Sequence, residues 1–156
     1  MRISAKTDYA LRAVVELAAA EPGEPVKAER LATAQDVPLK FLENILAQLR
    51  QAGIVDSRRG PEGGYLLARP ADEVTLADVI RSIDGPLAGI QGRRPQDVEY
   101  VGHAAGLRDV WVAVRSSLRG VLEHVTLADV AAGEQPACVA ELTKDPDAWE
   151  THPPRR

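Results

Sequence analysis

The sequence of 156 residues contains one cysteine and no long apolar run. Cys138 alone cannot form an internal disulfide or an all-cysteine metal site. No stretch approaches the roughly 18 consecutive apolar residues of a membrane-spanning helix, and the N-terminal segment MRISAKTDYALR lacks the apolar core of a secretory signal. These absences favour a cytoplasmic protein without a membrane segment.

The sequence also lacks a recognisable catalytic or metal-binding set. His103, His124 and His152 have no obvious nucleophile beside them, and no Ser/His/Asp, Cys/His or metal-ligand combination has a workable spacing. We therefore expect no enzyme activity, no metal site and no cofactor. The 45% of apolar residues is enough for a core, and the 27% of charged residues disfavours global disorder.

The net charge of −4 is unevenly divided along the chain. Residues 1–70 contain ten Lys/Arg and nine Asp/Glu, whereas residues 71–156 contain nine and fourteen. Binding to DNA depends on where cations lie relative to phosphate, so a mildly acidic protein can present a locally basic face. Charge by itself does not decide the function.

Residues 37–67 contain the pattern around which the rest of the chain can be placed. Apolar residues recur there at the spacing of a helix with one buried stripe. They are Leu39, Leu42, Ile45, Leu46 and Leu49. Val37 and Pro38 begin this helix and Gly53 ends it. The residues of the opposite, polar face are Lys40, Glu43, Asn44 and Gln48.

Two strand-like segments, residues 54–55 and 65–67, follow this helix, and a turn rich in arginine and glycine joins them. A helix followed by such a hairpin is the skeleton of a winged helix. Residues 60–64 lack the GK[ST] ending and the strand-loop-helix context of a nucleotide-binding loop. Their glycines are better explained by the positive φ of a wing turn.

Two further helices are predicted upstream, over residues 5–20 and 27–34, with a connector of proline and glycine between them. Only residues 35–37 separate the second of these helices from the one at Leu39. Two helices joined by about three residues, the second with a polar exposed face, indicate a helix-turn-helix.

The polar helix face admits two interpretations, and the wing favours one of them. Amide and charged side chains on a recognition helix can match the pattern of base edges in a major groove, but they could also form an ordinary solvated face. Arg58 and Arg59 at an exposed hairpin tip favour DNA, because a cation there adds little stability but can reach a phosphate or a narrow minor groove.

The second half begins with a short helix and a long loop. Residues 76–82 form a helix capped by Thr75 and Asp78, and the motif TLADV of residues 75–79 recurs at 126–130, which we interpret as two independent helix caps. Residues 84–106 show no period and are either mobile or functional. From Gly133 onward the polar, proline-containing sequence predicts a weakly ordered tail.

A helix of roughly nineteen residues with a wide apolar stripe is predicted from Leu107. The stripe consists of Leu107, Val110, Trp111, Val114, Leu118, Val121, Leu122 and Val125. It could cover the protein's own core, but its length outside the winged unit favours packing on a second subunit. A homodimer also suits DNA recognition, since paired half-sites multiply discrimination.

These residues resemble the Rrf-two family of bacterial winged-helix regulators, which includes the iron–sulfur cluster regulator, the nitric-oxide-sensing repressor and the cysteine-metabolism repressor. The similarity runs through MRISAKTDYALRAVVELA, FLENILAQLRQAGIV, RRGPEGGYLLARP and VTLADVIRSIDGP, and resumes weakly over the long helix. It implies a mainly α fold with a small β-hairpin, in which a winged helix-turn-helix precedes a long C-terminal dimerisation helix.

The resemblance also implies a homodimer that binds palindromic operators in double-stranded DNA. The positions that fall where such proteins approach DNA are Tyr9, Lys40, Phe41, Glu43, Asn44, Arg58, Arg59, Gly63, Gly64 and Tyr65, and the helical pattern adds Gln48. We expect Lys40, Glu43 and Asn44 to read bases. The two arginines would contact phosphate or the minor groove, and the ring of Phe41 could instead anchor the helix.

Residues 88–106 contain none of the three cysteines that cluster-binding members carry in this loop. Asp8 and His103 resemble non-cysteine ligands of such clusters, but without thiolates we interpret them as a surface carboxylate and a hydrogen-bonded or solvated histidine. Cys138 is interpreted as an incidental thiol unless it proves exposed and low in pKa. These three are retained only as possible effector or sensor residues.

The sequence therefore predicts a homodimeric transcriptional repressor that acts without an iron–sulfur cluster. The expected parts are a DNA-binding domain (1–84), an effector loop (85–106), a dimerisation helix with a short following helix (107–132) and a tail (133–156). A small molecule, a partner protein or Cys138 chemistry would supply the signal. The alternatives are a winged-helix protein-interaction module that does not bind DNA, and a cluster- or thiol-dependent redox-sensing regulator.

Overall fold

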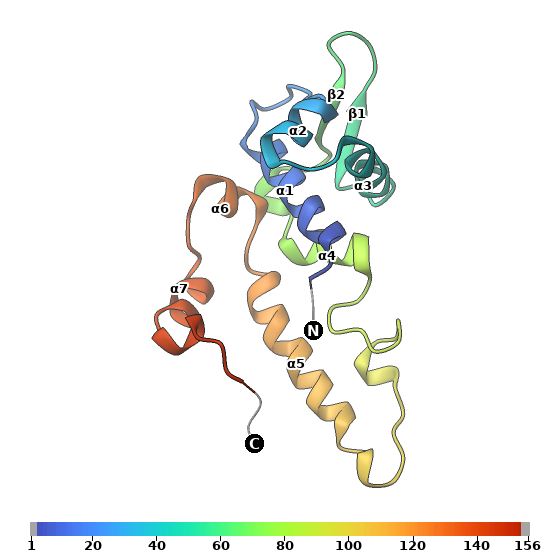
Figure 1. Cartoon of the computed structure of the whole chain (residues 1–156), viewed down its shortest axis with the longest axis vertical. Coiled ribbons are helices and arrows are strands. Elements are labelled where there is room, and N and C mark those ends of the chain that lie inside the picture. Colours follow the sequence, from blue (N-terminus) through green and yellow to red (C-terminus); the bar gives the residue numbers. More distant parts are fainter. Residues whose placement is uncertain (1–2, 154–156) are drawn as a thin grey trace.

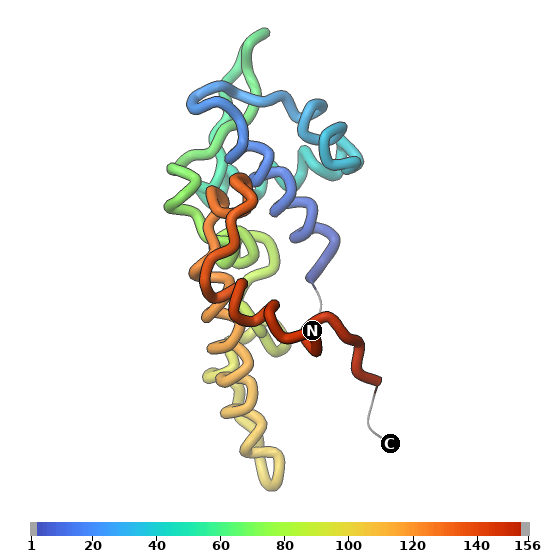
Figure 2. The backbone as a smooth tube through the Cα atoms, turned by 90° about the vertical axis from the view of Figure 1, so that its left-hand side faces the viewer, coloured from blue at the N-terminus to red at the C-terminus, as the bar shows by residue number. Residues whose placement is uncertain are grey.

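The computed structural model describes residues 3–153 and confirms the predicted fold class, mainly α with a small β-hairpin (Figure 1). In chain order the elements are α1 (Ala5–Ala19), α2 (Ala28–Gln35), α3 (Leu39–Gln51), β1 (Val55–Arg58), β2 (Gly64–Leu67), α4 (Leu76–Asp84), α5 (Leu107–Leu122), α6 (Leu127–Ala132) and α7 (Ala137–Thr143). The winged helix-turn-helix occupies one end of an elongated molecule, and α5 extends toward the other end (Figures 1 and 2).

Helix α1 lies at the centre of the winged unit. Ser4 caps its N-terminus by accepting a hydrogen bond from the Thr7 N–H at 3.1 Å. Its buried face packs with apolar residues of α2, α3 and α6 in one core. Helix α6 joins this core through Leu127, which is fully buried. The chain after α5 therefore returns to the winged unit instead of extending further away from it.

The turn between α2 and α3 is formed by Asp36 and Val37. Asp36 has a left-handed φ of 51°, which aspartate tolerates better than most residues. The Val37 N–H donates to the Ala32 carbonyl at 2.9 Å, and the Val37 side chain is buried. This local structure holds α2 and α3 at a fixed angle, as in the predicted helix-turn-helix.

Helix α3 buries four of the five residues of its predicted stripe. Leu42, Ile45, Leu46 and Leu49 are at most 1% exposed. Leu39 was also expected in the stripe, but it is 36% exposed because it lies in the first helical turn, next to the helix-turn-helix corner and beyond the core. The buried stripe is therefore one turn shorter than predicted.

The wing is a short antiparallel hairpin. Its register runs from Val55 opposite Leu67 to Arg58 opposite Gly64. Val26 adds a third paired segment, because its N–H and C=O each form a 2.8 Å hydrogen bond with Tyr65. The sequence placed Arg58 in the turn, but pairing with Gly64 makes it the last residue of β1.

The two TLADV motifs both form capping boxes, as predicted. Thr75 and Asp78 cap α4, and Thr126 and Asp129 cap α6. Hydrogen bonds from Thr126 lower the pKa of the Asp129 carboxyl. The two motifs also lie next to each other in the fold, because Thr75 and Thr126 form an antiparallel bridge.

This bridge corrects the prediction for Val125. Helix α5 ends at Leu122, and Val125 is 4% exposed in the core, where its carbonyl accepts a hydrogen bond from the Leu76 N–H at 3.0 Å. Val125 shares the spacing of the apolar stripe, but pairing with α4 turns it inward. It is therefore not part of a surface for a second subunit.

Helix α5 and the preceding segment, residues 85–106, run side by side as an arm (Figures 1 and 2). The segment contains a bridge between Ile90 and Arg93 and a 3-10 turn at Pro95–Asp97 that packs on α5. It is therefore not structureless, although it lacks long helices and strands. Helix α5 itself contains no buried residue.

The segment after Gly133 contains regular structure where the sequence predicted a weakly ordered tail. Pro136 begins α7, and a second turn, Pro146–Trp149, folds back so that the Trp149 indole N–H donates to the Thr143 carbonyl at 3.0 Å. Proline at a helix start costs no hydrogen bond, so the prolines of this segment begin helical turns and do not prevent regular structure. None of the helices in residues 3–153 is both long and apolar enough to cross a membrane.

Candidate nucleic-acid interface

The exposed face of α3 carries most of the predicted base-reading residues. Lys40, Glu43 and Asn44 are all exposed. Ala47 and Gln51 are exposed as well and continue the same face at helical spacing. These two residues were not among the predicted positions, although the i+3 and i+7 spacing from Asn44 indicates them.

Gln48 differs from its neighbours on α3. Its side-chain amide donates to the carbonyls of Ser82 at 3.0 Å and Ile83 at 3.4 Å, at the end of α4. These bonds hold α3 against α4. The Gln48 amide nitrogen is therefore engaged within the protein, at the flank of the exposed face.

The wing presents two arginines in different environments. Arg59 is exposed and has no side-chain hydrogen bond or ion pair within residues 3–153. The exposed Arg58 side chain donates from Nη1 to the Gly23 carbonyl at 2.9 Å, which ties the wing to the connector before α2. Both remain accessible, but Arg59 is the freer of the two.

Two glycines predicted at the DNA surface, Gly63 and Gly64, are required because neighbouring backbone leaves no room for a side chain. A Cβ on Gly63 would lie 2.3 Å from the Arg58 carbonyl oxygen, and one on Gly64 would lie 2.6 Å from the Val26 backbone. Gly60, at the turn, does have a positive φ of 102°. Tyr65 is half-buried and packs against the core while its backbone pairs with Val26.

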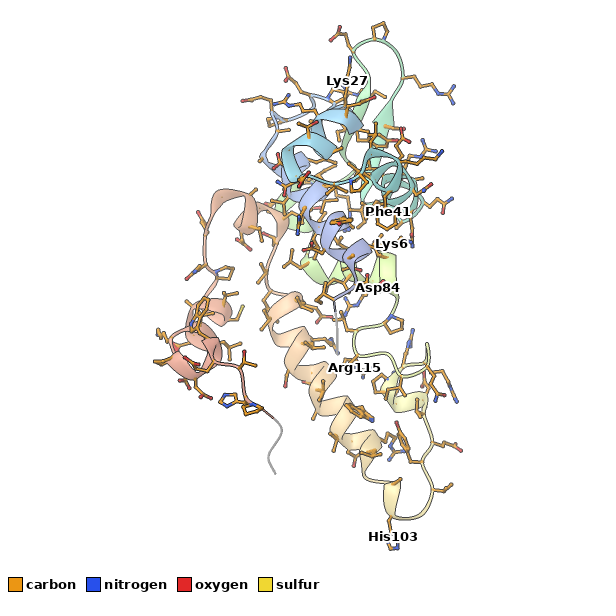
Figure 3. The ribbon with its side chains drawn as sticks, in the orientation of Figure 1. Lys6, Lys27, Phe41, Asp84, His103 and Arg115 are labelled. Carbon is orange, nitrogen blue, oxygen red and sulfur yellow. The ribbon has the colours of Figure 1, made fainter. Side chains whose placement is uncertain are left out.

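Lys27 is a cation that sequence analysis did not place at this surface. It is exposed at the N-terminus of α2, and its backbone nitrogen would lie 3.0 Å from a Cβ on Gly64 (Figure 3). Its position beside the wing depends on the bridge between Val26 and Tyr65, which no local pattern signals. On the other side, Arg50 of α3 donates to the Ser57 hydroxyl of β1 at 3.0 Å, so α3 and the hairpin are joined directly.

Tyr9 and Phe41 connect α1 to the start of α3. Their rings meet edge to face, with centroids 5.8 Å apart, and the Arg12 guanidinium lies 5.6 Å from the Tyr9 ring centre. Phe41 is still 41% exposed, so it both anchors the helix and contributes to the surface. Asp8 forms an ion pair with Arg12 at 2.5 Å.

The three possible sensor residues are not brought together within one chain. Asp8 lies on α1 in the winged unit, His103 lies at the far end of the arm, and Cys138 is half-buried in α7 (Figures 1 and 3). The described residues contain no group of three or more His, Cys, Asp or Glu side chains close enough to hold a metal ion.

A helix-turn-helix with an exposed polar second helix, joined to a hairpin with an arginine at its tip, defines a winged helix-turn-helix DNA-binding protein. Residues 3–133 match the Rrf2, or Rrf-two, family, described as an iron-dependent transcriptional regulator. The chain belongs to the Rrf2 family of HTH-type transcriptional regulators, which are not enzymes.

Relatives and solved structures agree with this assignment. The chain is 52% identical over 151 residues to Rv1287 of Mycobacterium tuberculosis, named as a candidate HTH-type transcriptional regulator, and the match covers 97% of this chain and 94% of that protein. The structure of CymR, the global cysteine regulator of Bacillus subtilis, superimposes with a TM-score of 0.73 at 31% identity over 86% of this chain and 99% of that one. IscR of T. potens gives 0.69 at 32% identity, over 85% and 88%.

The residues of this chain do not fit an iron–sulfur cluster. Such clusters are held mainly by cysteine thiolates, and the full sequence has only Cys138. That thiol lies on α7 and not in the 85–106 segment. Within residues 3–153, no set of cysteine thiolates matches the iron dependence in the family description.

Proposed function

We propose that the protein is a homodimeric repressor that binds a palindromic operator. The observation that carries this proposal is the exposed polar face of α3 beside a wing whose Arg59 has no protein partner within residues 3–153. A buried or internally paired surface would have no such free donors. In the proposed complex α3 enters the major groove and the wing contacts the adjacent backbone or minor groove.

Individual residues receive roles from their chemistry. In this proposal Lys40, Glu43 and Asn44 read base edges, and the exposed Ala47 methyl group contacts a thymine methyl. Arg59 and, more weakly, Arg58 contact phosphate or the minor groove. Lys27 and the start of α2, which has no side-chain cap, offer a further phosphate contact. Tyr9, Gly63, Gly64 and Tyr65 shape this surface, and Gln48 positions α3.

The proposed dimer interface lies on α5. Leu107 is 41% and Val110 is 51% exposed, and the other stripe residues of the helix are only half-buried: Trp111, Val114, Leu118, Val121 and Leu122. Leu122 packs on a small cluster with Ala77 and Ile80, so the chain covers part of the stripe itself. A second copy would cover the remainder, as an amphipathic helix without buried residues requires.

We also propose that the regulator works without an iron–sulfur cluster and receives its signal through residues 85–106. Protein purified without oxygen should then contain no stoichiometric iron or sulfide by metal analysis, and stoichiometric amounts of both would overturn this part of the proposal.

Selection and sequencing of genomic fragments by the purified protein tests the main proposal. We expect enrichment of a palindrome with half-sites about one helical turn, or a multiple of it, apart. If no motif is enriched and the affinity for DNA does not depend on salt, the protein is a winged-helix interaction module and not a DNA-binding repressor.

A further inference from the structure

A pocket of about 450 Å³ lies between the end of α4, the segment that follows it, and α5. Its volume is typical of a small-molecule site. Four arginines line it: Arg81, Arg94, Arg115 and Arg119. Glu123 is the one acidic residue in this lining. Arg115 donates to the side-chain oxygen of Gln96 and so lies between α5 and the 85–106 segment (Figure 3).

The concentration of arginine is unexpected in this part of the chain. Residues 71–153 contain seven Lys/Arg against fourteen Asp/Glu, yet four of the seven cations line this pocket. Like charges gathered in a cleft repel one another and create a positive potential that attracts anions.

Contacts within the protein compensate only part of this charge. Glu123 accepts hydrogen bonds from Arg81 and from Arg119 Nε, the latter at 3.0 Å, and these bonds lower the pKa of its carboxyl. Arg115 is paired with a neutral amide, and the Arg94 side chain has no hydrogen-bond or ion-pair partner within residues 3–153. With Glu123 ionised, the pocket keeps a net positive charge.

We propose that this pocket is an effector site for a small anion that carries phosphate or carboxylate groups. Guanidinium groups bind both kinds of oxyanion through paired N–H donors, and several of them converge here. Describing the ligand as an effector rests on the proposed regulatory function, whereas anion binding itself can be measured without DNA.

The location of the pocket connects it to the DNA-binding surface. Gly85, in its lining, directly follows α4. Gln48 of α3 holds the carbonyls of Ser82 and Ile83 at the same helix end, and Thr7 of α1 donates to the Asp84 carboxylate at 2.6 Å. An anion that moves the end of α4 would therefore act on the recognition helix through existing hydrogen bonds.

Isothermal titration calorimetry of the full-length protein with inorganic pyrophosphate and, separately, with citrate tests the proposal, with chloride used to match ionic strength. We expect one saturable site per chain for at least one probe, and the probe that binds identifies the preferred oxyanion. The double variant Arg94→Gln, Arg115→Gln should bind at least about tenfold more weakly. Arg108→Gln, on the same helix but outside the pocket, should bind like the wild type.

Three controls keep the outcomes separate. Circular dichroism and sedimentation must show that the double variant folds and associates like the wild type, and a change in association would assign these arginines to the subunit interface and overturn the proposal. Arg59→Ala should retain anion binding, so a failure of DNA binding can be distinguished from a failure of anion binding. Absence of saturable binding, undiminished binding by the double variant, or an operator affinity that does not respond to the bound anion would each overturn the effector site.

Discussion

Arg58 and Arg59 are neighbours in the sequence but have different surroundings. Arg58 is held by the Gly23 carbonyl, whereas Arg59 has no side-chain partner within residues 3–153. An exposed cation without a protein partner gains most from a phosphate, because it loses no existing contact on binding. At the scale of single residues, we therefore propose Arg59 as the principal DNA contact of the wing.

Arg59→Ala should weaken binding to operator and to unrelated DNA together, and should reduce the slope of log affinity against log salt by about one. Fluorescence anisotropy over a series of salt concentrations measures both quantities. Lys144→Ala on α7, which removes a cation that pairs with Glu141 far from the wing, serves as the control. If affinity and slope do not change in Arg59→Ala, the wing does not contact DNA.

Asn44→Ala should instead change sequence preference. An exposed amide in the middle of the α3 face can bond to one base, so its loss should remove about 1–3 kcal/mol of discrimination at one operator position. Dissociation constants for the operator and its single-base variants measure this effect. Equal weakening on all sequences would show that Asn44 contacts the backbone and not a base.

Among the elements, those determined by neighbouring residues could be predicted from the sequence. Helix α3 begins at Leu39, directly after the Pro38 that was expected to start it, because Pro38 and the apolar spacing are local signals. Contacts between distant residues could not be predicted. Val125 shares the spacing of a surface stripe but pairs with α4, and Lys27 reaches the wing only through the Val26–Tyr65 bridge. The arginine pocket was missed because its residues come from three separate segments.

Gly64→Ala tests how the wing is attached. The added methyl group would lie 2.6 Å from the Val26 backbone, so the bridge to Tyr65 must open or shift. We expect a loss of about 1–3 kcal/mol in the free energy of unfolding, measured by chemical denaturation, together with weaker DNA binding. Gly120→Ala, in α5 with no atoms within 4 Å of the new methyl group, should be neutral or stabilising. Equal stability of the two variants would contradict the close approach.

The whole molecule contains the winged unit and the arm formed by α5 and residues 85–106 (Figures 1 and 2). Helix α5 projects from a well-packed unit and buries none of its residues, so the arm lacks a core of its own. Removing residues from Leu107 onward would also remove Leu127 from the main core, so a truncation cannot isolate the role of α5. Single substitutions on the exposed stripe avoid this problem.

Val110→Asp should dissociate the proposed dimer without unfolding the chain. Val110 is 51% exposed in one chain, so the new carboxylate is harmless there, but in an interface it would be buried at a cost of about 2 kcal/mol or more. Analytical ultracentrifugation should show a larger fraction of monomer, with an unchanged circular dichroism spectrum. Ser116→Asp, also exposed on α5 but off the stripe, should remain dimeric. A dimer that persists in Val110→Asp would place the interface elsewhere.

Photo-crosslinking to operator DNA tests most directly whether α3 and the wing contact one duplex. In a Cys138→Ser background, single cysteines at Ala47→Cys, Glu62→Cys and Glu141→Cys place the reagent on α3, on the wing and on α7, all at exposed positions. The account predicts cross-links to the same operator from residues 47 and 62 and none from residue 141. Cross-links from residue 141 alone, or from none of the three in a protein that still binds the operator, would contradict it.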